Sequence, residues 1–460
     1  MQHKKSAMEK AITMKGGRTG LRFLLFLGCL LLPAGLRAEP LSLQQAVDLA
    51  LAHAPAVQAA EAGRDAAAED EALGRSWLLP YIEASGSIQR RRHNTAYDTP
   101  QTLFKNDLNY NENTIGVRVV QSLFDLERWA GYRQGELSAE SGELRLRLER
   151  QRLMLETVQA FLDAMTAQAA LSAAGARETA AQKLAVQAEA AQRVGTAAMP
   201  ERLDAEARRD LAKADRLRAE NDLDQARSRL ASLIGSSVDG LNPPQFADVT
   251  ADLANMKPEA WEEKAAAQAL PVQLAGVQFG VAEQGKRKAL GGALPKVEAF
   301  GQISRDRSSD TILNRGVTVR DQAIGVQVKM PLYAGGGTTA QMRKSEKEAL
   351  QAEFLMADDV RLARLTARQA FLAMRAAGAQ LEATRQSVLS TSRAADAAHL
   401  GHDVGLRSIS EVLDADERTF TAQKNLAAAS AQYVFAALQL RASVGELTGR
   451  PLPAVFGELP

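Results

Sequence analysis

Cysteine and aromatic residues are scarce in this sequence. One of its 460 residues is cysteine, Cys29, and only 5% are aromatic, although 46% are hydrophobic. Because no cysteine follows position 29, we expect neither disulfides nor thiol chemistry in the rest of the chain. Much of the apolar content is alanine and leucine, which is typical of long, closely packed helices rather than of mixed globular domains.

Long apolar runs are also missing after residue 38, where no stretch reaches the roughly 18 residues that indicate a membrane-spanning helix. An exported protein of this kind is soluble in the periplasm, secreted, or a β-barrel of the outer membrane, whose alternating strands escape hydropathy analysis.

Motifs for chemistry are missing too. We find no nucleotide-binding glycine loop, no zinc motif and no nucleophile paired with a base, so we expect neither an enzyme nor a cofactor. His399 and His402 are three residues apart and could form a two-histidine metal site, but surface histidines are the simpler interpretation.

The N-terminus has the pattern of a secretory signal peptide over residues 1–38. Six basic residues precede an apolar core from Phe23 to Leu32, and Leu36-Arg37-Ala38 offers a cleavage site. An uncleaved anchor and lipidation of Cys29 stay open as alternatives. Without these 38 residues the chain keeps 49 basic and 54 acidic residues, a balance that does not suggest nucleic-acid binding.

Two short stretches indicate a long internal duplication. Residues 194–205 (Val-Gly-Thr-Ala-Ala-Met-Pro-Glu-Arg-Leu-Asp-Ala) and 404–415 (Val-Gly-Leu-Arg-Ser-Ile-Ser-Glu-Val-Leu-Asp-Ala) align at an offset of 210. Each Val-Gly pair predicts a helix end, a tight turn and a new helix, which we call a tip. We place the first copy at 39–240, a linker at 241–258, the second copy at 259–448 and an irregular tail at 449–460.

Each copy combines long helices with one hairpin. Proline-free amphipathic stretches predict helices from Leu126 to Arg193 and from Thr338 to His402, each followed by a return helix after its tip. A helix of about 68 residues spans roughly 100 Å and needs partners along its length, which favours coiled-coil packing.

The hairpins are predicted at about 81–124 and about 296–332, where apolar and polar residues alternate. The polar stretches Arg91–Asn113 and Arg305–Arg320 are expected to be loops. Arg90-Arg91-Arg92 would then lie near the outer end of a strand, where it could meet anionic lipopolysaccharide or simply be solvated.

Four strands cannot close a membrane barrel, since single-chain barrels need at least about eight, and exposed sheet edges are a liability. Three chains would supply twelve strands. The predicted fold is therefore mainly α with a small transmembrane β part: a duplicated protomer of long coiled-coil helices that form an α-helical barrel, plus four strands contributed to a trimeric 12-strand outer-membrane β-barrel.

The sequence resembles the TolC family of outer-membrane channel proteins over residues 40–448. The resemblance rests on the second tip, the duplication and two strand exits, Gln121-Ser122-Leu123-Phe124-Asp125 and Met330-Pro331-Leu332-Tyr333-Ala334-Gly335-Gly336. The family usually has proline at the position of Ser122, as in Pro331 here, so the first strand-to-helix bend is expected to be less fixed.

This resemblance implies a homotrimer in the outer membrane of a Gram-negative bacterium with a long periplasmic part. It implies the exit duct of a tripartite efflux pump or type I secretion system, with a periplasmic adaptor (membrane fusion protein) and an inner-membrane transporter of RND or ABC type as partners. Substrates would pass through an iris-like gate at the helix tips. The tips that would contact the adaptor are Val194, Gly195, Thr196, Val404, Gly405 and Leu406.

The family's charged entrance corresponds to Glu201, Arg407, Glu411 and Asp414. If residues 407–415 are helical, the last three share one face, and threefold symmetry turns each acid into a ring that favours cations. The alternative is an ordinary solvated helix face. A second function class stays open for the whole chain, an envelope-anchored structural coiled-coil protein or adhesin without transport activity.

Overall fold

The computed structural model describes residues 40–99, 102–196, 198–242, 257–309 and 315–447. The predicted signal peptide with Cys29, most of the predicted linker and the predicted irregular tail lie outside the described residues. Among the helices that are described, none combines the length and the apolarity needed to cross a membrane.

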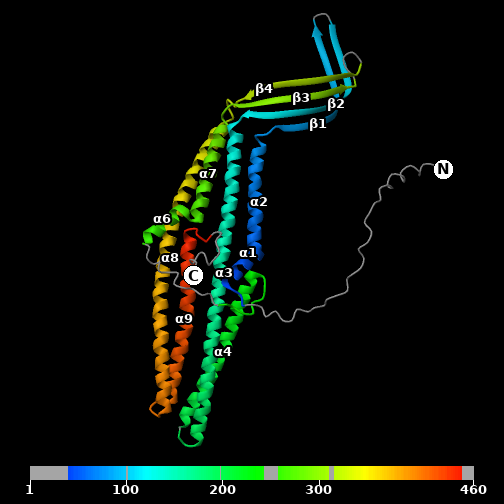
Figure 1. Cartoon of the computed structure of the whole chain (residues 1–460). Helices are drawn as coiled ribbons and strands as arrows, with labels where there is room; N and C mark the ends of the chain where they lie inside the picture. The colour runs from blue at the N-terminus through cyan, green and yellow to red at the C-terminus, as the bar shows by residue number, and fades with distance from the viewer. Residues whose placement is uncertain (1–39, 100–101, 197, 243–256, 310–314, 448–460) are drawn as a thin grey trace, which may run out of the picture. The chain divides into compact units, whose positions relative to one another are not determined.

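Two series of elements follow each other in the same order, two helices, two strands and two helices (Figure 1). The first series is α1 (Leu43–His53), α2 (Pro55–Ser76), β1 (Tyr81–Thr99), β2 (Thr102–Phe124), α3 (Leu126–Arg193) and α4 (Met199–Ile234). The second is α6 (Pro258–Gln268), α7 (Leu270–Gly291), β3 (Lys296–Ser308), β4 (Val317–Lys329), α8 (Gly337–Asp403) and α9 (Ile409–Ser443).

The long helices confirm the sequence-based prediction. Helix α3 has the predicted bounds, and α8 begins one residue before the predicted start and ends one residue after the predicted end. Asp125 starts α3 because its side chain accepts a hydrogen bond from the backbone N–H of Arg128 at 3.2 Å.

The strands form one antiparallel sheet in the order β1-β2-β3-β4 (Figure 1). The prediction of a loop from Arg91 to Asn113 is wrong, because β1 and β2 stay paired from Tyr81↔Val120 to Thr99↔Thr102. Backbone hydrogen bonds between the strands do not depend on side-chain alternation, so the ladder continues where the apolar pattern stops. The second loop is likewise shorter than predicted, since β3 runs to Ser308 and β4 begins at Val317.

The helices pack along their lengths, with α3 against α2, α4, α7 and α9. The largest buried cluster joins α1, α3, α4 and α9 around Phe161, Leu230 and Leu438. Glycine allows α2 to approach α3 closely, because a Cβ on Gly135 would lie 2.4 Å from the carbonyl oxygen of Asp70. Each tip is thus carried by a pair of packed helices, α3 with α4 and α8 with α9.

Candidate functional site: the helix tips and the sheet

Both tips are built by the same backbone device. Gly195 and Gly405 adopt left-handed φ angles of 78° and 74°, which glycine accepts without strain. The next N–H then closes the helix: Thr196 donates to the carbonyl of Ala191 at 2.9 Å, and Leu406 to that of Gly401 at 2.8 Å. The Val-Gly pairs therefore end α3 and α8 as predicted.

The second tip starts its return helix with a reciprocal cap. The Ser408 hydroxyl accepts from the N–H of Glu411 at 3.3 Å, while the Glu411 carboxylate accepts from the N–H of Ser408 at 2.9 Å. This capping box satisfies two backbone donors that a helix start leaves open. The hydrogen bond from the Ser408 backbone is the main reason that the pKa of Glu411 lies below its ordinary value.

The first tip has no such cap. Its return helix begins after Ala198, which has no side chain to accept a hydrogen bond, and Pro200 lies in the first turn. Glu201 occupies the position of Glu411, is exposed, and forms no ion pair with any residue that the structure describes. The two equivalent acids therefore have different local roles.

The structure corrects the prediction for Arg407. This residue precedes the helix, which starts at Ile409, so Arg407, Glu411 and Asp414 do not share one helical face. The helix begins later because Ser408 takes the extended backbone of an N-cap. Arg407 lies over Gly401 and still reaches Glu411, with Nη1 3.6 Å from Oε1.

Asp414 is held by an arginine that the sequence reasoning missed. Arg208 of α4 binds Asp414 of α9 at 2.5 Å and Asp204 of its own helix at 3.1 Å. A further donor of the same guanidinium reaches the Ser410 hydroxyl at 3.1 Å. The hydrogen bond with Asp414 is the main reason that the pKa of Arg208 lies above its ordinary value.

This contact, the Arg208 bridge, joins the two return helices inside one chain. A buried cluster beside it brings α3, α4, α8 and α9 together through Leu184, Ala398 and Val412. Farther from the tips, Arg177 of α3 repeats the arrangement, with Asp215 at 2.7 Å and Glu417 at 3.0 Å. The i, i+4 spacing of Asp204 and Arg208 was a visible signal in the sequence, but only the fold shows that Asp414 lies opposite.

The two histidines near the second tip have separate partners. His399 Nε2 lies 2.9 Å from Asp416, and His402 Nδ1 lies 3.0 Å from the carbonyl oxygen of Arg407. In the described part of the chain, no group of three or more His, Cys, Asp or Glu side chains is placed to hold a metal ion.

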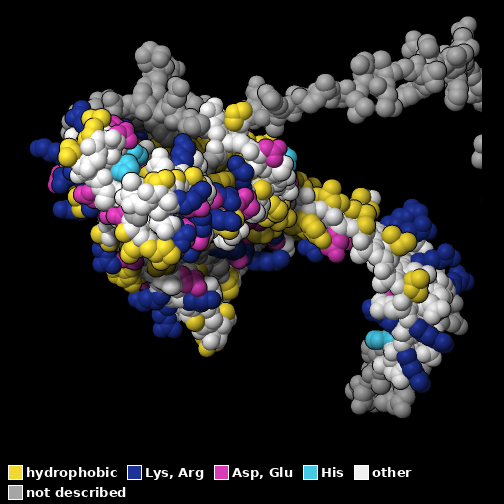
Figure 2. All heavy atoms as spheres, turned by 90° about the horizontal axis from the view of Figure 1, so that it is seen from below, with side chains coloured by type: hydrophobic (Ala, Val, Ile, Leu, Met, Phe, Trp, Pro, Cys, Tyr) yellow, Lys and Arg dark blue, Asp and Glu magenta, His cyan; other side chains and the backbone are white. Residues whose placement is uncertain are grey.

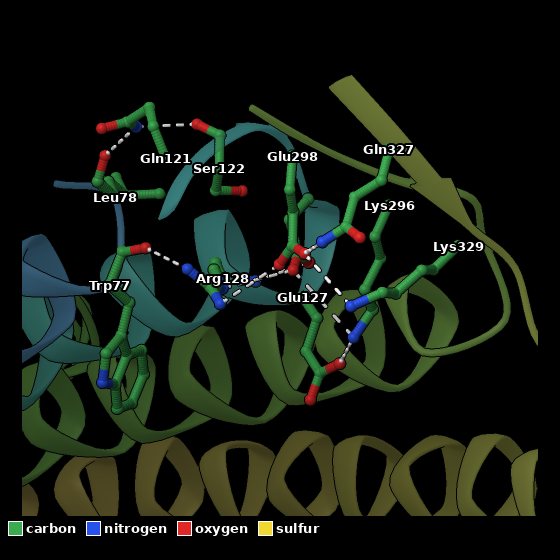
Figure 3. A network of polar contacts seen from close by, with 11 residues as sticks. Trp77, Leu78, Gln121, Ser122, Glu127, Arg128, Lys296, Glu298, Gln327 and Lys329 are labelled. Carbon is green, nitrogen blue, oxygen red and sulfur yellow. Dashed lines mark hydrogen bonds and ion pairs between the residues drawn. The ribbon is translucent and has the colours of Figure 1, made fainter. Parts of the chain in front are cut away.

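Polar contacts fix the bend between sheet and helices (Figure 3). The side-chain amide of Gln121 donates to the carbonyl oxygens of Leu78 and Ser122, both at 2.8 Å. Arg128 donates to the carbonyl oxygen of Trp77 at 3.1 Å and lies 3.6 Å from Glu298. Hydrogen bonds thus connect the residues around Ser122 with the end of the preceding helix and with β3, and the expectation of a less fixed bend stays a prediction.

The sheet has one apolar and one polar face. In the register, Ile82, Val119, Gly301 and Ile324 stand in one row, and Ile324 is 92% exposed. We call this face outward. Residues at the alternate positions, such as Glu83, Arg118 and Gln302, form the polar inward face. An apolar outward band is the pattern of strands that face lipid.

Comparisons with known proteins show which family this chain belongs to. The sequence profile described as "Outer membrane efflux protein" matches residues 46–236 and 263–446, and the chain belongs to that family. It is 29% identical over 399 residues to outer membrane protein TolC of Vibrio cholerae, covering 86% of this chain and 88% of that one. It is 27% identical over 421 residues to the proteases secretion protein PrtF of Dickeya chrysanthemi, covering 90% of each.

Solved structures agree on the fold. The outer membrane protein VceC of Vibrio cholerae superimposes with a TM-score of 0.72 over 88% of this chain and 96% of VceC, at 17% identity. The outer-membrane channel OprN gives 0.73 over 88% and 90%, at 19% identity. The fold class and the resemblance predicted from the sequence are confirmed.

This member of the family is an outer-membrane exit duct for efflux or type I secretion in a Gram-negative bacterium. The family match selects this function over the structural coiled coil or adhesin considered from the sequence.

Proposed function

We propose that three copies of the chain close a twelve-stranded barrel and a continuous duct below it. The observation that supports this most is the sheet itself: β1 and β4 each have a partner on one side only, while the outward face is apolar. An unpaired edge in hydrocarbon leaves backbone groups unsatisfied at several kcal/mol each. Pairing β4 of one copy with β1 of the next removes every edge.

The tips are the docking end for a periplasmic adaptor and an inner-membrane transporter of RND or ABC type. Val194, Val404 and Leu406 are 75%, 62% and 82% exposed, so each turn presents apolar surface that suits a protein contact. Gly195, Gly405 and Thr196 shape the turns that present them. The relatives' names include both a TolC and a protease secretion protein, so the proposal covers both efflux and type I secretion.

Glu201, Arg407, Glu411 and Asp414 form the gate in this proposal. Threefold symmetry makes each acid a ring, and carboxylate rings favour cations. Asp414 is neutralised within its own chain by Arg208, and Glu411 is engaged by Ser408 and Arg407. Of the three acids in this set, Glu201 is the one that forms no ion pair in the described part of the chain. It is therefore available to Arg407 of a neighbouring copy in the closed state.

The test is single-channel conductance of the purified trimer in a planar bilayer, with and without divalent cations on the tip side. We expect a small, cation-preferring conductance that divalent cations block. Replacing Glu411 and Asp414 by alanine should raise the resting conductance and weaken the block, because the bonds that hold the tips are lost. Unchanged conductance and block would remove both residues from the gate.

A negative result needs a control. If a folded, inserted trimer does not conduct, the double variant decides, since only a sealed duct should begin to conduct when its gate is weakened. If neither the wild type nor the double variant conducts, the proposal that the chain forms a duct is overturned.

A further inference from the structure

The two faces of the sheet differ in charge as well as in polarity. Five acids lie at inward positions: Glu83, Glu112, Glu298, Asp306 and Asp321. From the base of the sheet as far as the Arg92↔Asn109 pair, no outward position carries Asp or Glu. The outward face is therefore apolar near the helices, and it carries no acid as far as the Arg92↔Asn109 pair.

Arginine takes over where the outward apolar residues stop. We call the following set the arginine girdle: Arg90, Arg92, Arg305, Arg307 and Arg320. All five are exposed, and none forms an ion pair with a residue whose side chain the structure describes. Figure 2 shows hydrophobic side chains over the strands near the helices and Lys and Arg side chains farther out. The intervening Arg91 differs, since it faces inward and binds Glu112 at 2.7 Å.

Two members of the girdle repel each other. Arg305 and Arg320 are directly paired across β3 and β4, where neighbouring side chains lie about 5 Å apart. Like charges in this position are destabilising. Among the described strand residues no outward acid lies beside this pair, so a bound anion would stabilise the arrangement.

The girdle begins at one level relative to the membrane. The last outward apolar residues before the polar part are Ile88, Ile115, Ile303 and Ile324 on β1 to β4. Each isoleucine after the first lies two residues nearer the base of the sheet than the residue that pairs with the isoleucine of the preceding strand. A stagger in one constant direction is what tilted strands show where they cross a flat boundary. On the outward face Arg90 and Arg305 directly follow Ile88 and Ile303, and Arg320 follows Ile324 after Gln322, so these three arginines lie at the outer edge of the apolar band.

We propose that the arginine girdle binds the phosphate groups of the phosphorylated glycolipid in the outer leaflet. A guanidinium forms paired hydrogen bonds with phosphate oxygens, and it suits an interface where one side is lipid and the other is water. The lipid's acyl chains lie against the apolar band, while its phosphates neutralise the repulsion between Arg305 and Arg320.

The test measures the thermal unfolding midpoint and the lipid affinity of the purified full-length protein in detergent. The probes are a bis-phosphorylated lipid A and its dephosphorylated analogue with the same acyl chains. We expect the phosphorylated lipid to raise the midpoint, and the double variant Arg305→Gln, Arg320→Gln to bind it about tenfold more weakly. The matched control is Arg91→Gln on the inward face, which should bind as the wild type does.

The double variant Arg305→Gln, Arg320→Gln also gives a second measurement, its unfolding temperature without lipid, which should rise while its lipid affinity falls. Without lipid it should unfold at a higher temperature than the wild type, because the like-charge pair is gone. If it does not fold, Arg90→Gln with Arg92→Gln tests the other end of the girdle.

Three results would overturn the proposal. Equal binding of the dephosphorylated analogue would show that the acyl chains alone are recognised. Full competition by inorganic phosphate would show a site for free anions. Equal binding of an anionic phospholipid would show a general electrostatic contact rather than recognition of the glycolipid.

Discussion

The two tips share a backbone and differ in how their return helices begin. Gly195 and Gly405 make the same left-handed turn, but only the second tip has the Ser408–Glu411 capping box. At the first tip, Ala198 offers no cap, and Glu201 has no ion pair in the described structure. Glu411 thus helps to start a helix, whereas Glu201, at the equivalent position of the first tip, is available for a contact outside the chain.

The same asymmetry holds about two turns farther along the return helices. Arg208 and Arg418 are equivalent by the 210-residue offset. Arg208 bridges Asp204 and Asp414, whereas Arg418 is exposed and makes no ion pair in the described part of the chain. Duplication supplied the two arginines, and the packing of α4 on α9 gave only one of them a bridging role.

Breaking the Arg208 bridge should have the largest effect. We expect Arg208→Ala to raise the resting conductance of the trimer, since the link between α4 and α9 is lost in every copy. Because Asp414 is half exposed, we take about 1 kcal/mol per protomer, and a loss of about 3 kcal/mol per trimer would change the open-to-closed ratio roughly a hundredfold. Planar-bilayer recording measures the change.

Arg418→Ala is the matched control for this variant. It removes the same charge from the equivalent position and should leave the resting conductance near that of the wild type. A rise as large as that of Arg208→Ala would show that net charge, rather than the bridge, governs the resting state.

Exchanging the caps should have an intermediate effect. Ser408→Ala removes the cap of α9, at a cost of about 1 kcal/mol to the start of that helix, so its first amides should exchange hydrogen roughly fivefold faster. Ala198→Ser should do the reverse at the first tip, because Glu201 already stands at the third helical position for a capping box. Hydrogen exchange followed by mass spectrometry reads both tips together. Equal hydrogen exchange in the wild type, Ser408→Ala and Ala198→Ser would contradict the view that the two tips differ in helix capping.

Acidification should have the smallest effect. The pKa of Glu411 is lower in the folded protein than its ordinary value of 4.5, so its contribution to stability is complete above that value. The contribution disappears as the pH falls through the lower, folded pKa. The start of α9 should therefore loosen below about pH 4.5, as measured by exchange corrected for the intrinsic rate. Glu411→Gln should remove this pH dependence, and its persistence would assign the effect to another group.

The sequence predicted the elements whose pattern is long and uniform. Helix α3 was placed to the residue because a proline-free stretch from Leu126 to Arg193 keeps its apolar spacing and ends at a Val-Gly pair. The apolar alternation stops at Ile88 and Ile115, so the sequence predicts a loop beyond them, although β1 and β2 remain paired there. Their pairing depends on the partner strand, which a single stretch of sequence does not contain.

The sequence indicates the candidate gate residues but not how their side chains pair. The family resemblance points to Glu201, Arg407, Glu411 and Asp414, and the structure places Glu201 on α4, Glu411 and Asp414 on α9, and Arg407 before the start of α9 at Ile409. Arg208 was missed because its partner Asp414 lies 206 residues away in the chain. Long-range ion pairs of this kind depend on which helices meet, and the sequence of one helix does not specify that.

The stagger of the outward isoleucines also fixes how neighbouring copies would join. Each strand's boundary residue steps two positions toward the base, from Ile88 through Ile115 and Ile303 to Ile324. Continued around the proposed barrel, the same step places Val326 of one chain opposite Ile88 of the next. In the proposed trimer, the register between neighbouring chains would thus follow from the level at which each chain places its isoleucines at the lipid headgroups.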